Sequence, residues 1–213
     1  NRAIQALRQP GSSFKPLVYS AAIDAGFTLS SSLIDSPRAY ATGAKTAGDA
    51  EVWTPKNYGD KVLGKVSLRT ALVKSLNLPT IGLCEELKPK QVIVYSRRFG
   101  IKAKMMENLT TCLGSFSVRL QEMISAYGVF ANQGRLVKPI YILRVEDQYG
   151  NILESSVPEL KQVTSEETAF LLNNLLQDVV QSGTGRRARA IGRPSAGKTG
   201  TTNKNMDAWF LGF

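Results

Sequence analysis

The sequence predicts an α+β fold, in which a helical subdomain packs with an antiparallel sheet. Stretches with apolar residues three or four positions apart, the spacing of one helix face, dominate the middle of the chain. Segments typical of strands and of a β-hairpin turn lie nearer the C-terminus. With 213 residues and no internal repeat, the chain is long enough for one sizeable core.

The first helix is expected over residues 12–25, where apolar positions recur with helical spacing and Gly26 follows as a terminator. Pro16 is compatible with the first turn, because the amides there have no partner inside a helix. Ser12 is therefore expected at a helix N-terminus. Residues 28–60 are rich in Ser, Thr, Gly and Pro, and are expected to form a long loop region.

A second helix is expected over residues 67–76. Pro79 restricts the residue before it, which predicts a helix end near Asn77 and places Ser75 and Asn77 at a helix-to-loop junction. The remaining helices are expected after Pro79, from Pro89 to Gly100, over residues 120–132, and from a capping box of Thr164 and Glu167 to Gly183.

Strands are expected in three places. Residues 140–153 alternate around Tyr149-Gly150-Asn151, which predicts a β-hairpin. Residues 194–202 and 207–213 are predicted to form two adjoining strands.

The composition leaves several partners open. Lys plus Arg number 27 and Asp plus Glu number 17, giving a net charge of +10, which suits a nucleic acid, an anionic membrane or an acidic substrate. No acidic residue lies between Asp178 and Asp207. The basic residues of that stretch form either a solvated loop or a field that attracts carboxylates toward Lys198; they are Arg186, Arg187, Arg189, Arg193, Lys198 and Lys204.

Cys84 and Cys112 are the only cysteines, and both have apolar neighbours. Two cysteines do not make a disulfide framework, so buried free thiols are expected, and the cysteines do not indicate the cellular compartment.

No apolar run approaches the roughly 18 to 20 residues that cross a bilayer. The chain begins without Met or a signal peptide, so we expect it to be a segment of a longer protein.

Any serine nucleophile in this chain must be activated by a residue other than histidine, because the chain contains 0 His. A Ser-His-Asp triad is excluded, and lysine must serve as the base. Ser12 and Lys15 are three positions apart at a helix start and share one face. The first-turn amides favour an alkoxide at Ser12. Burial and nearby charge, such as Lys198, lower a lysine pKa enough for Lys15 to accept the proton.

A second string, Ser75-Leu76-Asn77, adds to this chemistry. The hydroxyl of Ser75 can relay a proton, and the amide of Asn77 can hold a substrate peptide group. Taken alone, this string also fits a helix-end serine followed by an asparagine turn. The string Ser12-Ser13-Phe14-Lys15, taken alone, also fits a capping serine beside a surface lysine.

Lys198-Thr199-Gly200-Thr201 is the most specific string. On a strand, Lys198 and Gly200 face one side while both threonines face the other. Gly200 leaves room for a substrate backbone, and Lys198 with the threonine hydroxyls can hold a terminal carboxylate. The backbone amides of Ser12 and Thr201 are predicted to form an oxyanion hole.

Residues 192–199 also match the nucleotide-binding pattern G-x-x-x-x-G-K-[ST]. That motif needs a strand before it and a helix after it. Here a helix and a basic loop precede it, and Gly200-Thr201-Thr202-Asn203 is poor helix material. The sequence therefore disfavours a nucleotide site.

The strings S-x-x-K, S-x-N and K-T-G in this order are similar to the signature of penicillin-binding proteins and class A β-lactamases. The surrounding sequence resembles the transpeptidase domain of class A, bifunctional penicillin-binding proteins. The resemblance covers essentially the whole chain and is carried by residues 8–16, 53–58, 68–77, 113–115, 126–134, 183–188 and 198–210.

The resemblance implies an α/β sandwich of the penicillin-binding type and a role for each site residue. Ser12 would be acylated, Lys15 would take its proton, Ser75 would pass a proton to the leaving amine, Asn77 would orient the substrate, and Lys198, Thr199 and Thr201 would bind its carboxylate, beside Gly200. The substrate would be a peptidoglycan stem peptide ending in D-Ala-D-Ala, and β-lactams would acylate Ser12. No cofactor, metal or nucleic acid is implied.

The resemblance also implies that residues 1–213 are the central part of that domain. A glycosyltransferase domain and a membrane anchor would precede it, and the sheet would need strands from both sides of this chain. The site would act on the extracytoplasmic face of the bacterial membrane.

Four alternatives remain. A class A β-lactamase needs a glutamate in an E-x-x-L-N setting, and the nearest candidates, Glu85-Glu86 and Glu166-Glu167, lack the trailing Leu-Asn, so slow deacylation is predicted. A D,D-carboxypeptidase stays open. The intact site strings disfavour a catalytically inactive binding module. A nucleic-acid binder is disfavoured because aromatic residues do not interleave with the basic stretch.

Overall fold

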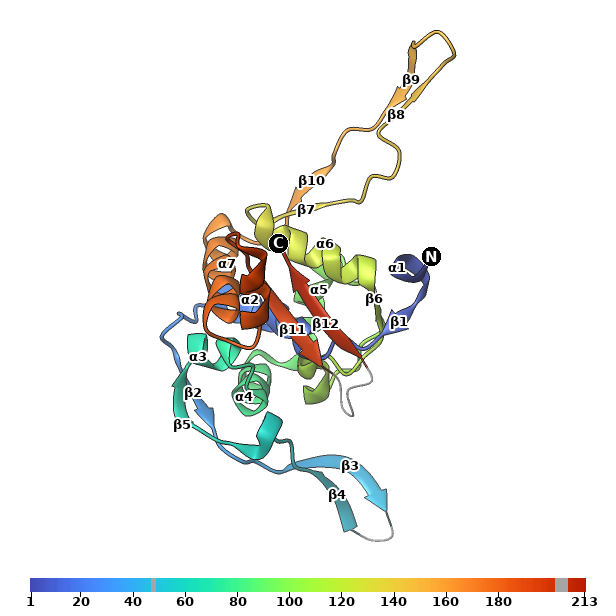
Figure 1. The fold of residues 1–213 in the computed structure, drawn as a ribbon. Helices are drawn as coiled ribbons and strands as arrows, with labels where there is room; N and C mark the ends of the chain where they lie inside the picture. The colour runs from blue at the N-terminus through green and yellow to red at the C-terminus, as the bar shows by residue number, and fades with distance from the viewer. Residues whose placement is uncertain (47–48, 202–206) are drawn as a thin grey trace.

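A computed structural model describes residues 1–46, 49–201 and 207–213 (Figure 1). Helices gather around a central buried helix, and the strands of these residues pair as six two-stranded antiparallel sheets. The predicted α+β class is confirmed. No helix within the described ranges has both the length and the apolar character needed to cross a bilayer.

The helices and 3-10 turns (η) are α1 (Arg2–Gln5), η1 (Gly11–Phe14), α2 (Lys15–Asp24), η2 (Tyr58–Asp60), α3 (Leu68–Val73), α4 (Asn77–Leu87), α5 (Pro89–Arg98), η3 (Leu109–Leu113), α6 (Leu120–Ala131), α7 (Glu166–Gln181) and η4 (Arg186–Ile191). The strands are β1 (Leu7–Arg8), β2 (Ser32–Asp35), β3 (Tyr40–Thr46), β4 (Asp49–Trp53), β5 (Gly64–Ser67), β6 (Val118–Arg119), β7 (Arg135–Val137), β8 (Arg144–Glu146), β9 (Ile152–Ser155), β10 (Leu160–Gln162), β11 (Gly197–Thr201) and β12 (Ala208–Gly212).

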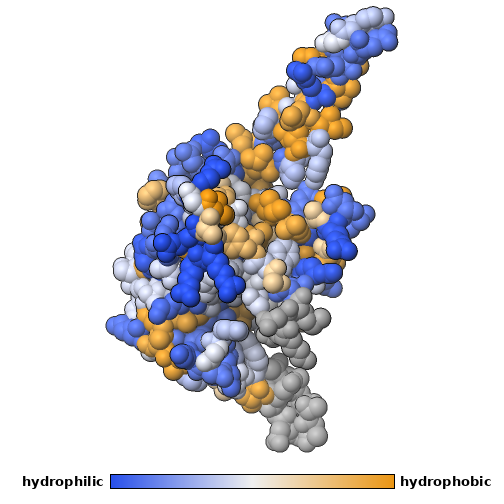
Figure 2. Space-filling view, viewed as in Figure 1, coloured by the Kyte–Doolittle hydropathy of each residue, from blue (hydrophilic) through white to orange (hydrophobic). Residues whose placement is uncertain are grey.

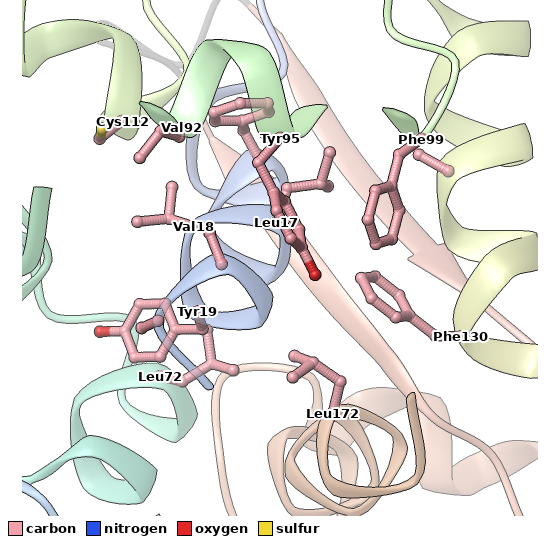
Figure 3. Packing of buried hydrophobic residues seen from close by; sticks show 14 of the residues in the cluster. Leu17, Val18, Tyr19, Leu72, Val92, Tyr95, Phe99, Cys112, Phe130 and Leu172 are labelled. Atoms are coloured by element: carbon pink, nitrogen blue, oxygen red, sulfur yellow. The ribbon is translucent and has the colours of Figure 1, made fainter. Parts of the chain in front are cut away.

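Helix α2 lies at the centre of the hydrophobic core. Every residue from Lys15 to Ala22 is buried, because α3, α4, α5 and α7 all contact this helix. Figure 3 shows Leu17 and Val18 of α2 among apolar side chains from other elements. A helix that is enclosed on all sides needs no polar stripe, and the apolar run of its sequence fits that position. Lys15 is thereby carried into the core.

The turn between α3 and α4 carries Ser75. Helix α3 ends at Val73, so the junction expected at Ser75 is confirmed, whereas Asn77 is not in a loop but is the first residue of α4. Pro79, however, lies in the first turn of α4, where its missing N–H costs no hydrogen bond. The prediction that this proline marks a helix end was wrong, because proline is equally compatible with a helix start.

Strands β11 and β12 form the sheet that borders the site. They pair in antiparallel register, with Lys198 opposite Leu211 and Gly200 opposite Trp209, which confirms the two strands predicted here. Lys198 and Gly200 are buried, whereas Thr201 is exposed, as the predicted alternation requires. Residues 202–206, which include the predicted strand end Thr202 and the basic residue Lys204, lie outside the described ranges.

Residues 28–60 do not form the predicted loop region. They contain β2, β3 and β4, and β2 pairs with β5, placing Ser32 opposite Ser67 and Asp35 opposite Gly64. A pairing between segments about thirty residues apart leaves no local trace in the sequence, and the polar composition of the segment favoured a loop.

Residues 135–162, which we call the arm, contain the predicted hairpin as β8 and β9, joined to the body through β7 and β10. Figure 1 shows the arm extending away from the helices.

The helix that follows, α7, is capped by Ser165, which accepts from the amide of Thr168. The predicted cap, Thr164, instead donates to the carboxylate of Asp24 on α2, so a tertiary partner displaced the local capping box.

Cys84 and Cys112 form a disulfide, so the prediction of free thiols was wrong. Both cysteines are fully buried, and their Cα atoms lie 6.2 Å apart, one on α4 and one on η3. The sequence showed the burial of each residue but not the contact between α4 and η3, which depends on tertiary packing.

Candidate active site

The turn η1 carries Ser12 at the entry to α2. The helix predicted over residues 12–25 forms, but its first turn is 3-10, and Ser12 is half-buried within that turn. Ser13 fixes the turn by donating to Pro10 O at 2.7 Å, and Tyr127 donates to Ser13 O at 2.7 Å. The backbone at Ser12 is therefore held from both sides.

Lys15 is fully buried one turn after Ser12. Its Nζ donates to Ser75 O at 2.7 Å, to Asn77 Oδ1 at 2.8 Å and to Leu76 O at 3.0 Å. Among the hydrogen bonds of the described residues, none joins Lys15 Nζ to Ser12 Oγ. For Lys15 to accept the proton of Ser12, its Nζ must be neutral and must release one of these three acceptors.

The electrostatics favour that neutral form. Burial lowers the pKa of Lys15 well below its ordinary value, and the charge of Lys198 lowers it further. The three hydrogen-bond acceptors of Lys15 favour its charged form, but all three are neutral groups and none is a carboxylate. An amine buried without a counter-ion can serve as a general base near neutral pH.

Lys198 meets Ser75 from the other side. Its Nζ donates to Ser75 Oγ at 2.9 Å and to Thr199 O at 3.0 Å. Burial lowers the pKa of Lys198 to about 7. The structure thus brings Lys15, Ser75, Asn77 and Lys198 into one hydrogen-bonded cluster, although they come from α2, the α3–α4 turn, α4 and β11.

The outer side of β11 carries Thr199 and Thr201. Thr199 Oγ1 shares a hydrogen bond of 2.7 Å with the hydroxyl of Thr184, which is exposed in the turn after α7. No catalytic role was predicted for Thr184; its turn, residues 183–185, was expected to end the helix and also carries part of the resemblance. Thr201 is exposed, so its hydroxyl is open to a ligand.

On the side where a Cβ would lie, Gly200 packs against the chain's own turn η1, while room for a substrate backbone at Gly200 stays a prediction. A Cβ on Gly200 would lie 2.4 Å from Pro10 O and 2.9 Å from Ser13 Cβ, so the space is filled by the chain's own turn η1. A Cβ on Gly11 would likewise lie 2.7 Å from Thr201 O. These two glycines let η1 and β11 pack backbone to backbone, which brings Ser12 to the edge of β11. The oxyanion hole from the amides of Ser12 and Thr201 stays a prediction.

Asn57 is a second residue whose role the sequence did not indicate. Its Oδ1 accepts from the amides of Asn77 and Leu78 at 2.7 and 3.2 Å. Asp35, which is fully buried, accepts from Asn57 Nδ2 at 2.6 Å. An asparagine some twenty residues upstream carries no local signal of capping a helix, and only the fold brings it there.

The rival chemistries fit the structure less well. Residues 197–199 of the nucleotide-binding pattern lie in strand β11, not in a loop that leads into a helix. Of the basic stretch, Arg186, Arg187, Arg189 and Arg193 are exposed, as a solvated basic loop requires, whereas Lys198 is buried.

The glutamates nearest to a β-lactamase motif lie on the surface. Glu85 is paired with Arg38 and Glu166 with Arg135, both at solvent-exposed positions. Neither glutamate takes part in the hydrogen bonds that join Lys15, Ser75 and Lys198.

Comparison with known proteins agrees with this geometry. Residues 1–213 match the family described as "Penicillin binding protein transpeptidase domain". Penicillin-binding protein 1A of Aquifex aeolicus is 38% identical over 213 residues, which are 100% of this chain and 29% of that protein. Penicillin-binding protein 1A of Pseudomonas aeruginosa is 36% identical over 265 residues, covering 100% of this chain and 32% of that protein. The chain thus spans about a third or less of these relatives.

Solved structures share the fold. The crystal structure of penicillin-binding protein 1A from Haemophilus influenzae has a TM-score of 0.91 and 31% identity, covering 100% of this chain and 37% of that one. Penicillin-binding protein A from M. tuberculosis, solved as an imipenem acyl-enzyme complex, has a TM-score of 0.86 at 22% identity, covering 100% of this chain and 53% of that one. The chain therefore belongs to the family of penicillin-binding protein transpeptidase domains, with class A proteins among its relatives.

Proposed function

We propose that this chain is a serine D,D-transpeptidase that cross-links peptidoglycan stem peptides. Ser12 Oγ attacks the carbonyl between the last two residues of a stem ending in D-Ala-D-Ala. The C–N bond breaks, the terminal D-Ala leaves as an amine, and an ester remains on Ser12. An amine from a neighbouring stem then attacks that ester, which forms the cross-link and frees the hydroxyl of Ser12.

Proton transfer in this scheme rests on the two buried lysines. Lys15, as a neutral amine, takes the proton of Ser12 as the new C–O bond forms. Ser75, which is hydrogen-bonded to both lysine nitrogens, passes a proton to the departing D-Ala nitrogen. Asn77 orients the substrate peptide, Lys198 with Thr199 and Thr201 holds its carboxylate, and the amides of Ser12 and Thr201 stabilise the oxyanion. The observation that carries the proposal is the convergence of the buried Lys15 and Lys198 on Ser75, with no carboxylate among their hydrogen-bond partners in the described residues.

The site is proposed to act outside the cytoplasm, in a protein with a membrane anchor and a glycosyltransferase domain. A solved relative at 23% identity carries the name D,D-transpeptidase domain of a peptidoglycan glycosyltransferase, from Eggerthella lenta. The disulfide of Cys84 and Cys112 supports the location, because disulfides persist mainly in oxidising compartments.

The test is intact-mass spectrometry after exposure to penicillin, with Ser12→Ala as the control. We expect a stable adduct of one penicillin on the unchanged chain and none on Ser12→Ala, because the ester forms on that oxygen. Rapid loss of the adduct would favour a β-lactamase instead. An adduct that survives Ser12→Ala would overturn the assignment of the nucleophile.

A second assay separates transpeptidase from D,D-carboxypeptidase. A stem peptide with D-Ala-D-Ala is supplied with and without an acceptor amine, and products are separated by mass. Cross-linked product in the presence of the amine is the expected result, because aminolysis competes with water for the same ester. Release of D-Ala with only hydrolysed product would assign the chain as a carboxypeptidase.

A further inference from the structure

We propose that Asn57 and Asp35 are positioning residues for the acylation of Ser12. Asn57 caps helix α4 from outside and so fixes the turn on which Lys15 is anchored, while buried Asp35 fixes Asn57. The inference rests on the proposed function, because its measured quantity is the acylation of Ser12.

Helix α4 has no cap of its own. The residue at its N-cap position, Leu76, offers no side-chain acceptor. The orphan amides of Asn77 and Leu78 are instead satisfied by Asn57 Oδ1, at 2.7 and 3.2 Å. The neighbouring residue Lys56 adds a second contact, because its carbonyl accepts from Asn77 Nδ2 at 2.8 Å. Residues 56 and 57 therefore hold both the backbone and the side chain of Asn77.

Asp35 decides which way the amide of Asn57 points. Asp35 Oδ1 accepts from Asn57 Nδ2 at 2.6 Å, so the nitrogen end of the Asn57 amide faces Asp35. The same Nδ2 donates to Lys61 O at 2.9 Å, and Leu63 N donates to Asp35 Oδ2 at 2.8 Å. With both donors of Asn57 committed, Oδ1 is left to face α4.

The fixed turn matters because Lys15 has all three of its acceptors there. Ser75 O, Leu76 O and Asn77 Oδ1 belong to three successive residues. Ser75 lies in the left-handed region with φ +58°, a conformation that a non-glycine residue keeps only when its surroundings hold it. If Asn57 is removed, the turn can relax and Lys15 Nζ moves relative to Ser12.

The experiment compares Asn57→Ala with Ser67→Ala in the full chain. Ser67 is a matched control because it caps α3, accepting from Thr70 N at 3.1 Å, at the end of α3 opposite to that turn, and no hydrogen bond of the described residues joins it to Asn77. The acylation rate with a fluorescent penicillin and the melting temperature are measured for each. Because small misplacement of reacting groups costs on the order of 10- to 100-fold in rate, Asn57→Ala should lose about that much. Ser67→Ala removes a cap on α3 and should lower the melting temperature, while its acylation rate stays within about twofold of the unchanged chain, since both lost hydrogen bonds go to Thr70.

A charge-swapped pair gives the second readout. Asn57→Asp sets a carboxylate against Asp35 and should slow acylation. The double variant Asn57→Asp with Asp35→Asn restores a donor facing an acceptor between positions 35 and 57, and only Lys61 O is left without its donor. Recovery of most of the rate in the double variant is the expected result, which a general loss of stability would not produce.

The outcomes are distinguishable. An Asn57→Ala variant that is folded and acylated at the unchanged rate would overturn the inference. If that variant does not fold, the swapped pair decides: recovery supports the inference, and a double variant that is folded but still slow overturns it. If the unchanged chain itself takes no penicillin, the proposed function fails, and this inference falls with it.

Discussion

The nucleophile region and the arm differ in how their polar atoms are satisfied. The nucleophile region, residues 11–15, 75–78 and 197–201, includes two lysines with 0% exposure, and their nitrogens bond to groups from other elements. The arm includes Tyr149 at 80% exposure and Leu143 at 74%. Figure 2 shows the arm projecting from the body with apolar patches among its polar surface.

Hydrogen bonds in the outer part of the arm are local. Asp147 accepts from the amides of Tyr149 and Asn151 within one turn, and Ser156 donates to Ile142 O across the hairpin. In the nucleophile region a change at one residue removes a partner from another element, whereas in the outer hairpin of β8 and β9 it removes a neighbour along the same hairpin. Substitutions should therefore act strongly on acylation in the first region and hardly at all in the second.

The largest effect is expected from Lys198→Met. Removing the group that donates to Ser75 should lower the acylation rate by about 100-fold or more, which is typical of lost proton-transfer catalysis. The measurement is the acylation rate with penicillin, on a variant whose folding is confirmed by its melting curve. A rate within about tenfold of the unchanged chain would contradict the role of Lys198.

The same variant makes a prediction about stability and pH. Since burial lowers the pKa of Lys198 from 10.5 to about 7, the unfolded chain binds more protons than the folded one between these values. The unchanged chain therefore gains stability from this group as pH rises from about 7 to about 10.5, by a few kcal/mol. Lys198→Met lacks that gain. Measured by urea denaturation, the unfolding free energy of the variant should therefore compare less favourably with that of the unchanged chain at pH 10 than at pH 6. If the variant and the unchanged chain differed in unfolding free energy by the same amount at both pH values, the lowered pKa of Lys198 would be contradicted.

A smaller effect is expected from Gly200→Ala. The new methyl group would lie 2.4 Å from Pro10 O, so η1 must move away from β11 and take Ser12 with it. We expect a loss of about 1–3 kcal/mol in unfolding free energy and a clearly lower acylation rate. The matched control is Gly82→Ala in α4, where a Cβ meets nothing within 4 Å, and which should be neutral or slightly stabilising. Equal behaviour of the two variants would show that the packing of η1 on β11 is not needed.

The smallest effect is expected from Leu153→Ser in the arm. This side chain is 66% exposed, and substitutions at such positions usually change the unfolding free energy by less than about 0.5 kcal/mol. The acylation rate should equal that of the unchanged chain. A loss of rate would show that the arm communicates with the nucleophile region and would remove the contrast between them.

The predictions from sequence succeeded where a local pattern carried the information. The helix of Lys15, the hairpin around Gly150 and the strand of Lys198 follow from periodicity and turn residues, and their positions are confirmed. The strands in residues 28–60, the cap of α7 and the disulfide were missed. In each of those cases the deciding partner lies far away along the chain, as with Ser32 and Ser67 or Cys84 and Cys112.

The order and spacing of the motifs, together with the absence of histidine, determined that any serine chemistry here must depend on lysine. Only the tertiary structure decided how that dependence is realised. It buried Lys15 and Lys198, which lowers the pKa of both, and it placed Asn57 on the end of α4. The reason is physical: residue type sets which protons a group can carry, but desolvation and partners from distant segments set when it carries them.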